Sequence, residues 1–134
     1  MGKTFGGCQC GGVRFYYEGP YTDVGYCHCS LCRQQSGSAF ATYMEVPEDR
    51  FHVAEGRDLL VRYGSTDRLD RYFCRNCGVT LYSTHRSFPG CVYISVGMLD
   101  SDEGIEPTHH QFVASKAKWY DIADALPQAA DWPE

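Results

Sequence analysis

The stretch Gly6-Gly7-Cys8-Gln9-Cys10-Gly11-Gly12 (GGCQCGG, residues 6–12) sets two thiols between two pairs of glycines. On a straight strand the two cysteine side chains would share a face but lie about 7 Å apart, too far to bind one ion together. The flanking glycines allow the backbone to curl into a knuckle, which brings the two sulfurs close. The stretch therefore predicts one half of a metal site.

A matching half lies in the middle of the chain, in CRNCG (residues 74–78). Its two thiolates are one turn apart, and the glycine that follows them permits a tight bend. Together the two pairs supply four thiolates, which is the ligand set of a closed structural zinc site. We expect one Zn²⁺ to pin the N-terminal hairpin to the middle of the chain through four ligands: Cys8, Cys10, Cys74 and Cys77.

A third cluster, YCHCSLC (residues 26–32), contains only three thiols: Cys27, Cys29 and Cys32. Three thiolates leave the fourth position of a zinc ion open to water or a ligand, as in catalytic sites. A fourth protein ligand would instead make the site structural. The ring of His28 is expected to point away from the metal, and Cys91 to be a buried inert thiol. The candidates for a fourth ligand are Cys91, His28, His52, His85, His109 and His110.

Length, charge and cysteine content limit the class of protein. A chain of 134 residues suits a single domain, which we expect over residues 4–128 with an irregular tail at 129–134. No apolar run approaches the roughly 20 residues of a membrane span. The net charge of -5, without a basic stripe, argues against nucleic acid as a partner. Eight cysteines without a signal peptide favour metal binding in the reducing cytoplasm over disulfides. A homo-oligomer is compatible with the sequence.

The hydrophobic pattern predicts a mainly β fold with antiparallel sheets and hairpins and little helix. Apolar and polar residues alternate in short runs that end at glycine, proline or acidic turns. Helix is expected only at residues 30–35 and 120–126. The predicted strands cover residues 13–18, 38–46, 51–53, 59–63, 69–73, 80–84 and 91–96.

Four segments resemble the family of glutathione-dependent formaldehyde-activating enzymes, which shares a domain with centromere protein V. They are GGCQCGGVRF (6–15), YCHCSLCRQQSGS (26–38), FCRNCGVTLY (73–82) and PTHHQFVASKAKWYDIADALPQ (107–128). The resemblance implies an Mss4-like fold. It also implies two zinc ions, a structural one at the four-cysteine set and a catalytic one at the three-cysteine set, in agreement with the spacing argument.

The resemblance further implies a carbon–sulfur lyase-type enzyme similar to S-(hydroxymethyl)glutathione synthase, which adds glutathione or a similar thiol to formaldehyde or another small aldehyde. Lys116 and Trp119 are expected to serve capping and packing rather than chemistry. A different class of function stays open: a non-catalytic zinc-binding interaction module in which both zinc sites are structural. The candidates for thiol binding are Arg33, Ser36, Gly37 and Ser38.

Overall fold

The computed structural model describes residues 2–133 and divides into two compact units. The first unit contains the chain up to Thr22 together with Met44–Gly104, and the second contains Asp23–Tyr43 and the chain from Ile105 onward. Each unit is therefore assembled from two separate stretches of sequence. The single domain over residues 4–128 stays a prediction.

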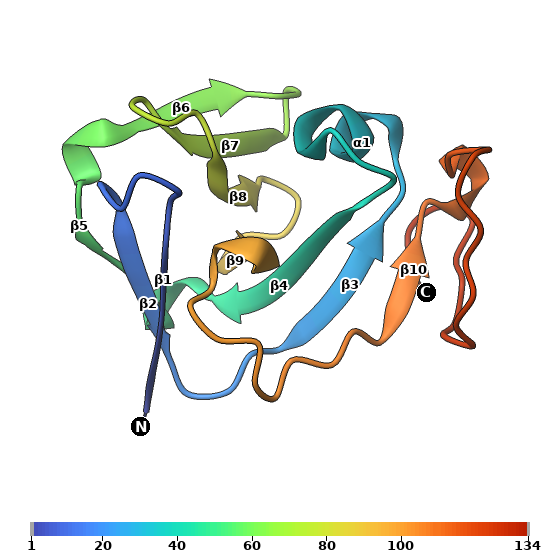
Figure 1. Ribbon diagram of the computed structural model, residues 1–134, viewed down its shortest axis with the longest axis horizontal. Coiled ribbons are helices and arrows are strands. Elements are labelled where there is room, and N and C mark those ends of the chain that lie inside the picture. The colour runs from blue at the N-terminus through green and yellow to red at the C-terminus, as the bar shows by residue number, and fades with distance from the viewer. Residues whose placement is uncertain (1, 134) are drawn as a thin grey trace. The chain divides into compact units, whose positions relative to one another are not determined.

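A three-stranded antiparallel sheet, in the order β1-β2-β5, forms one part of the first unit (Figure 1). Its strands are β1 (Lys3–Gly7), β2 (Arg14–Glu18) and β5 (Phe51–Glu55). The alternation read from the sequence is visible in β2, where Phe15 and Tyr17 are buried and the residues between them are only partly covered. The knuckle at residues 8–12 is the turn that joins β1 to β2.

The other part of the first unit is a run of antiparallel strands in the order β9-β8-β7-β6. It holds an apolar core that includes Leu81 and Ile94, both fully buried. The second knuckle, at residues 74–78, is the turn between β7 and β8. The strands are β6 (Leu60–Gly64), β7 (Leu69–Cys74), β8 (Thr80–His85) and β9 (Cys91–Ser95).

The second unit is smaller and its interior is more polar. Strand β3 (Asp23–Cys27) pairs in parallel with β10 (His109–Gln111), and α1 (Ser30–Ser36) follows β3 directly. Strand β4 (Ala41–Pro47) begins in this unit and ends in the first. Its buried side chains include the apolar residues Val24, Cys27, Ala39 and Ala117 and the polar residues His28, His110 and Gln111.

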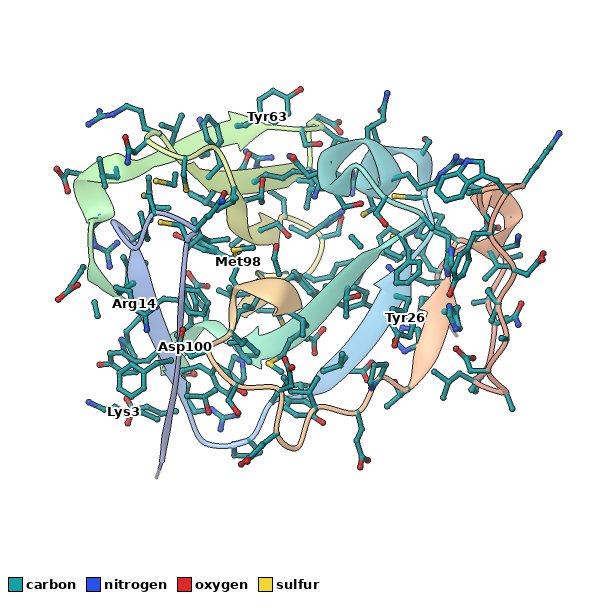
Figure 2. The ribbon with its side chains drawn as sticks, in the orientation of Figure 1. Lys3, Arg14, Tyr26, Tyr63, Met98 and Asp100 are labelled. Carbon is teal, nitrogen blue, oxygen red and sulfur yellow. The ribbon has the colours of Figure 1, made fainter. Side chains whose placement is uncertain are left out.

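Within the first unit, an ion pair links the β1–β2 hairpin to the segment that follows β9. The Arg14 guanidinium donates to both carboxylate oxygens of Asp100, with Nη1 at 3.1 Å from Oδ1, and Figure 2 shows the two side chains together. This contact with Arg14 lowers the pKa of the Asp100 carboxyl group. The backbone N–H of Asp100 also donates to the Phe5 carbonyl at 3.0 Å. The hairpin is thus fixed to the segment that follows β9.

The mainly β class is confirmed, and every predicted strand overlaps an observed one. Strands β1, β3 and β10 were not predicted, and the β3–β10 pair departs from the antiparallel expectation. Strand β4 starts at Ala41 rather than at residue 38.

Helix is scarce, as predicted. The helix predicted at residues 30–35 is confirmed as α1, which ends where Gly37 adopts φ 65° and donates to the Arg33 carbonyl at 2.9 Å. Within residues 2–133, none of the helices is both long and apolar enough to cross a membrane. The remaining helical pieces are single 3₁₀ turns: η1 (Glu48–Arg50), η2 (Arg57–Leu59), η3 (Val96–Met98) and η4 (Val113–Ser115).

The helix predicted at residues 120–126 is wrong, because that segment is irregular. Its polar groups bond to β10 or to their neighbours in place of intrahelical partners. The Asp124 carboxylate accepts from the His110 ring and from the Leu126 backbone N–H, at 3.0 Å each, and the Pro127 carbonyl accepts from the His110 backbone at 2.9 Å.

Two glycines of the first unit have similar backbone conformations but different surroundings, so substitutions there distinguish the cost of backbone strain from the cost of a steric clash. Gly56 and Gly104 both have φ in the left-handed region, at 78° and 73°. A Cβ at Gly56 would lie 1.9 Å from the Gly12 carbonyl oxygen beside the knuckle, whereas a Cβ at Gly104 would meet nothing within 4 Å. We expect Gly104→Ala to lower the free energy of unfolding by about 1 kcal/mol and Gly56→Ala by about 3 kcal/mol or more. Urea denaturation of both variants measures the difference, and equal losses would contradict this account.

Candidate metal centres

Four cysteine sulfurs meet in the first unit where the two knuckles face each other. All four lie within 4.8 Å of one another, and they belong to Cys8, Cys10, Cys74 and Cys77. Cys8 and Cys10 have their sulfurs 3.5 Å apart, and the Cys10 and Cys74 sulfurs are 3.8 Å apart. A tetrahedral ion with metal–sulfur bonds of about 2.3 Å places its sulfurs about 3.8 Å apart. The geometry therefore fits one metal ion.

Backbone N–H groups point at these sulfurs, as expected around thiolates. In the first knuckle, Val13 N–H donates to Cys8 at 3.2 Å and Gly12 N–H donates to Cys10 at 3.4 Å. Gly11, with φ 78°, supplies the turn. A hydrogen bond from the Asn76 side chain, followed by that from Gly12, lowers the pKa of the Cys10 thiol.

The second knuckle repeats this arrangement. The Gly78 backbone N–H closes the turn on the Cys74 carbonyl at 2.7 Å, and Gly78 has φ 81°. The backbone N–H of Val79 lowers the pKa of the Cys77 thiol to about 6. Hydrogen-bond donors that stabilise thiolates are what an anionic ligand set of this kind requires. The four-cysteine cluster is thus prepared to hold a metal.

The three-cysteine cluster is formed in the second unit where β3 runs into α1. Cys27 ends β3, Cys29 is the N-cap of α1, and Cys32 lies in its first turn. The three sulfurs lie within 4.8 Å of one another. Cys27 is buried, while Cys29 and Cys32 are partly exposed. The local fold thus brings all three predicted ligands together and leaves the cluster partly exposed to solvent at Cys29 and Cys32.

The thiols of this cluster cannot ionise independently. Hydrogen bonds from Cys29 and Cys32, with burial, raise the pKa of the Cys27 thiol. The hydrogen bond from Cys27, followed by that from Cys32, lowers the pKa of Cys29 to about 2. One thiolate therefore forms readily, and the others would need a cation beside them to lose their protons. A soft divalent metal meets that need.

Within residues 2–133, no fourth histidine, cysteine or carboxylate joins this cluster. His28 instead directs its Nε2 atom to Nδ1 of His110 at 2.8 Å, and His110 Nε2 contacts the Asp124 carboxylate at 3.0 Å. Burial, followed by the proximity of His110, lowers the pKa of His28. The other candidates lie elsewhere: His109 contacts Tyr43, His52 contacts Glu18, the His85 ring accepts from the Ser87 backbone, and Cys91 is half-buried in β9.

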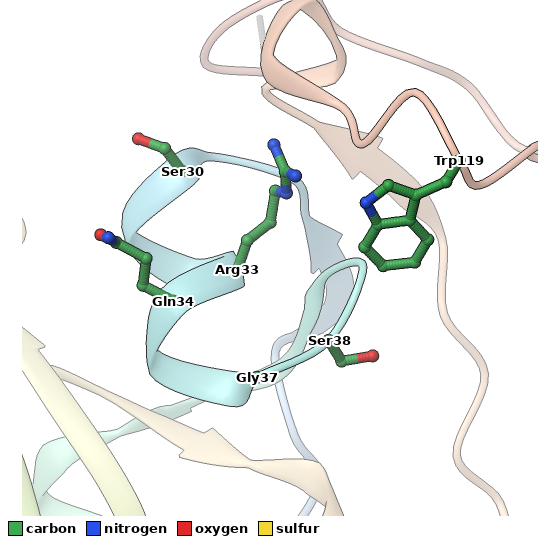
Figure 3. A pocket seen from close by; sticks show the side chains of 6 residues that line it. All are labelled: Ser30, Arg33, Gln34, Gly37, Ser38 and Trp119. Carbon is green, nitrogen blue, oxygen red and sulfur yellow. The ribbon is translucent and has the colours of Figure 1, made fainter.

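An open hollow of about 460 Å³ lies along α1 (Figure 3), and its lining includes none of the three cysteines. Three of the four residues predicted to bind a thiol line it, namely Arg33, Gly37 and Ser38. Ser36 does not line it, because its hydroxyl serves the turn after α1 and donates to the Phe40 carbonyl at 3.2 Å. The remaining lining residues are Ser30, Gln34 and Trp119.

Trp119, like Ser30 and Gln34, lines this hollow although the sequence did not identify it as a binding residue. Its side chain is 71% exposed, so the packing role expected from the tail motif is wrong. Lys116 does cap backbone carbonyls, since its Nζ donates to the carbonyls of Ala117 and Tyr120. Arg33 lies close to Trp119 in Figure 3, and its Nη1 donates to the Ser115 carbonyl at 3.0 Å.

Comparison with known proteins places this arrangement in a family. Residues 3–115 match the family model described as glutathione-dependent formaldehyde-activating enzyme. An uncharacterized lyase of Schizosaccharomyces pombe is 25% identical over 124 residues, which cover 92% of this chain and 88% of that protein. A Penicillium rubens protein provisionally named a glutathione-dependent formaldehyde-activating enzyme is 32% identical over 92 residues, or 66% of this chain.

The chain spans about half the length of the relatives named for formaldehyde activation. It covers 48% of the Penicillium rubens protein and 43% of a Podospora anserina protein of the same name, which is 28% identical. A crystal structure of a Rhodobacter sphaeroides protein has the same fold, with a TM-score of 0.61 and 26% identity over 92% of this chain and 98% of that one.

The first cluster has four cysteines and the second has three, and one substitution in each tests whether the first is structural and the second is open. We expect Cys74→Ser to unfold the protein or to lower its free energy of unfolding sharply, because bound metal contributes directly to folding at a closed site. Cys29→Ser should leave a folded protein that has lost only the metal of the three-cysteine cluster. Circular dichroism together with elemental analysis distinguishes the outcomes. Equal damage to folding by both substitutions would contradict an open, functional second cluster.

Proposed function

This chain belongs to the family of glutathione-dependent formaldehyde-activating enzymes, and from that premise we propose that it is a zinc-dependent carbon–sulfur lyase-type enzyme. It adds glutathione, or a similar thiol, to formaldehyde or another small aldehyde. The observation that carries the proposal is the set of three cysteine sulfurs within 4.8 Å of one another at the start of α1, the helix along which an open hollow lies.

Zinc is the metal that best suits both clusters. Thiolates are soft ligands, and sites of three or four thiolates favour Zn²⁺ among the common divalent ions. We assign a structural zinc to Cys8, Cys10, Cys74 and Cys77, and a catalytic zinc to the other three. Eight cysteines, none of which forms a disulfide within residues 2–133, suit a reducing compartment, so we assign the protein to the cytoplasm.

The chemistry of addition balances without any further reactant. The thiol sulfur attacks the aldehyde carbon, a carbon–sulfur bond forms, the carbonyl π bond breaks, and the thiol proton ends on the new hydroxyl oxygen. A zinc ion bound by Cys27, Cys29 and Cys32 would hold the incoming thiol as thiolate at neutral pH and keep the two reactants together. These three residues would hold that ion with one position left for the substrate.

The hollow along α1 supplies the recognition of a thiol peptide. Arg33 follows Cys32 in the sequence, and its guanidinium is fixed by the Ser115 carbonyl. Such a guanidinium suits a carboxylate of glutathione, which it can bind through two N–H groups. Trp119 offers an exposed aromatic face to the peptide. Gly37 and Ser38 complete the lining of the hollow on the side of the turn after α1.

The alternative, an interaction module with two structural zinc sites, has less support. It requires a fourth protein ligand at the three-cysteine cluster, and the histidines His28 and His110 are paired with each other instead. Glutathione with formaldehyde is therefore the first pair of substrates to examine.

We expect the zinc-loaded protein to accelerate the exchange between formaldehyde, glutathione and S-hydroxymethylglutathione, which two-dimensional exchange NMR measures directly. Cys29→Ser should abolish the acceleration, because it removes one ligand of the catalytic zinc. Cys91→Ser is the matched control and should retain it, since Cys91 belongs to neither cluster. Elemental analysis of the same samples should give two zinc ions in wild type and one in Cys29→Ser. A folded protein with two zinc ions that accelerates no thiol–aldehyde pair would overturn the proposal.

Trp119→Ala tests the hollow as the thiol site. Loss of the indole should raise KM for glutathione roughly tenfold, which corresponds to about 1.4 kcal/mol of lost aromatic contact. The value of kcat should change little, because Trp119 is not a metal ligand. Trp132→Ala is the control, since Trp132 is also exposed but contacts Phe112 instead. An unchanged KM would exclude Trp119 from substrate binding.

A further inference from the structure

A chain of hydrogen bonds reaches Cys27 from strand β10. The hydroxyl of Tyr43 lies 3.0 Å from Oε1 of Gln111 and 2.9 Å from Nε2 of His109. The side chain of Gln111 in turn hydrogen-bonds to Cys27. His109 and Gln111 are alternate residues of one strand and so share a face, and Gln111 is opposite Cys27 in the β10–β3 register. Cys27 and Gln111 are both buried, which protects these bonds from water.

When Cys27 is a thiolate, the donor and the acceptor of each hydrogen bond between Cys27 and His109 are determined. A thiolate accepts hydrogen bonds and cannot donate, so Gln111 must present its amide N–H group to the sulfur. Its Oε1 atom then faces Tyr43, and the single hydroxyl proton of Tyr43 is committed to it. The Tyr43 oxygen is left to accept from the Nε2–H group of His109.

Beyond His109, the contacts continue to a carboxylate. Nδ1 of His109 lies 2.9 Å from the Thr108 hydroxyl oxygen, and that hydroxyl donates to the Asp23 carboxylate at 2.6 Å. The carboxylate anchors the chain because it can only accept. The bond from the Tyr43 hydroxyl therefore fixes the rotamer of the Gln111 amide and its orientation toward Cys27.

We propose that Tyr43 and Gln111 are a positioning pair that holds a hydrogen-bond donor against the Cys27 sulfur and so makes it a strong but unreactive metal ligand. The inference rests on the proposed zinc at the three-cysteine cluster. Hydrogen bonds from the second shell fix the orientation of metal ligands and tune their chemistry. A donor at the sulfur draws electron density from it, so the incoming thiol, and not Cys27, attacks the aldehyde.

Cys27 and Cys29 differ in the kind of donor that reaches the sulfur. The Cys29 sulfur accepts from the backbone N–H of Cys32 at 3.3 Å, a bond that any sequence forming α1 would supply. Cys27 lies at the end of β3, and its backbone neighbours are engaged in pairing with β10, where His28 N–H donates to the Gln111 carbonyl at 3.0 Å. Gln111 thus contacts this segment twice: its backbone carbonyl accepts from His28, and its side-chain amide contacts Cys27.

The absorption spectrum of the protein with Co²⁺ in place of zinc reports on how easily the cysteine sulfurs are oxidised. We expect Tyr43→Phe and Gln111→Met to move the sulfur-to-cobalt charge-transfer band to longer wavelength, because a sulfur without its donor is easier to oxidise. Zinc affinity at this cluster, measured by chelator competition, should fall roughly tenfold. The double variant should match Gln111→Met alone, since Tyr43 acts through Gln111. Tyr63→Phe, an exposed tyrosine of the first unit, is the control and should change neither quantity.

The possible outcomes distinguish a failure of this inference from a failure of the proposed function. Wild-type bands in folded Tyr43→Phe and Gln111→Met proteins that bind cobalt at both clusters would overturn this inference and leave the proposed function intact. Additive shifts in the double variant would overturn the claim that Tyr43 acts through Gln111. A wild-type protein that binds metal only at the four-cysteine cluster would overturn the proposed function and this inference together. If Gln111→Met does not fold, Tyr43→Phe, which keeps the ring, decides alone.

Discussion

Repulsion between closely spaced thiolates is the constraint on which both units of this protein depend. Two unit charges about 4 Å apart repel by about 4 kcal/mol at an effective dielectric constant near 20. Each cluster brings several sulfurs within 4.8 Å of one another. Such an arrangement is stable as thiolates only around a cation, and the N–H groups directed at Cys8, Cys10 and Cys77 reduce the cost further. The knuckles, their glycines and the turns that bear them follow from this requirement.

The two units meet this constraint in different ways. In the first, the four-cysteine cluster is accompanied by an apolar core with Phe15, Leu81 and Ile94 fully buried or nearly so. In the second, few apolar residues are buried, and the ring of His28 contacts His110, which in turn contacts the Asp124 carboxylate. Hydrogen bonds of this kind can keep a partly exposed cysteine cluster in a fixed geometry without a large apolar core.

Cysteine spacing and short-range alternation were sufficient to predict the clusters, the β class and α1. Each of these features is encoded within a few residues. Strand β10 could not be predicted in this way, because a three-residue strand has no measurable period and its parallel partner lies far away in the sequence. For the same reason Tyr43 and Gln111 gave no signal as neighbours of Cys27. The helix expected at residues 120–126 failed because Asp124 and its neighbours bond to β10 instead.

The assembly of each unit from two distant stretches has a consequence for biosynthesis. Cys10 and Cys74, which share the four-cysteine cluster, are separated by 64 positions. The ribosome therefore delivers Cys8, Cys10, Cys27, Cys29 and Cys32 before either thiol of the second knuckle exists. A metal ion that arrives in this interval meets five thiols from two different native sites. An ion held by thiols of both sets would have to exchange thiolates before the native state forms, and metal transfer between ligands would then be a step of folding itself.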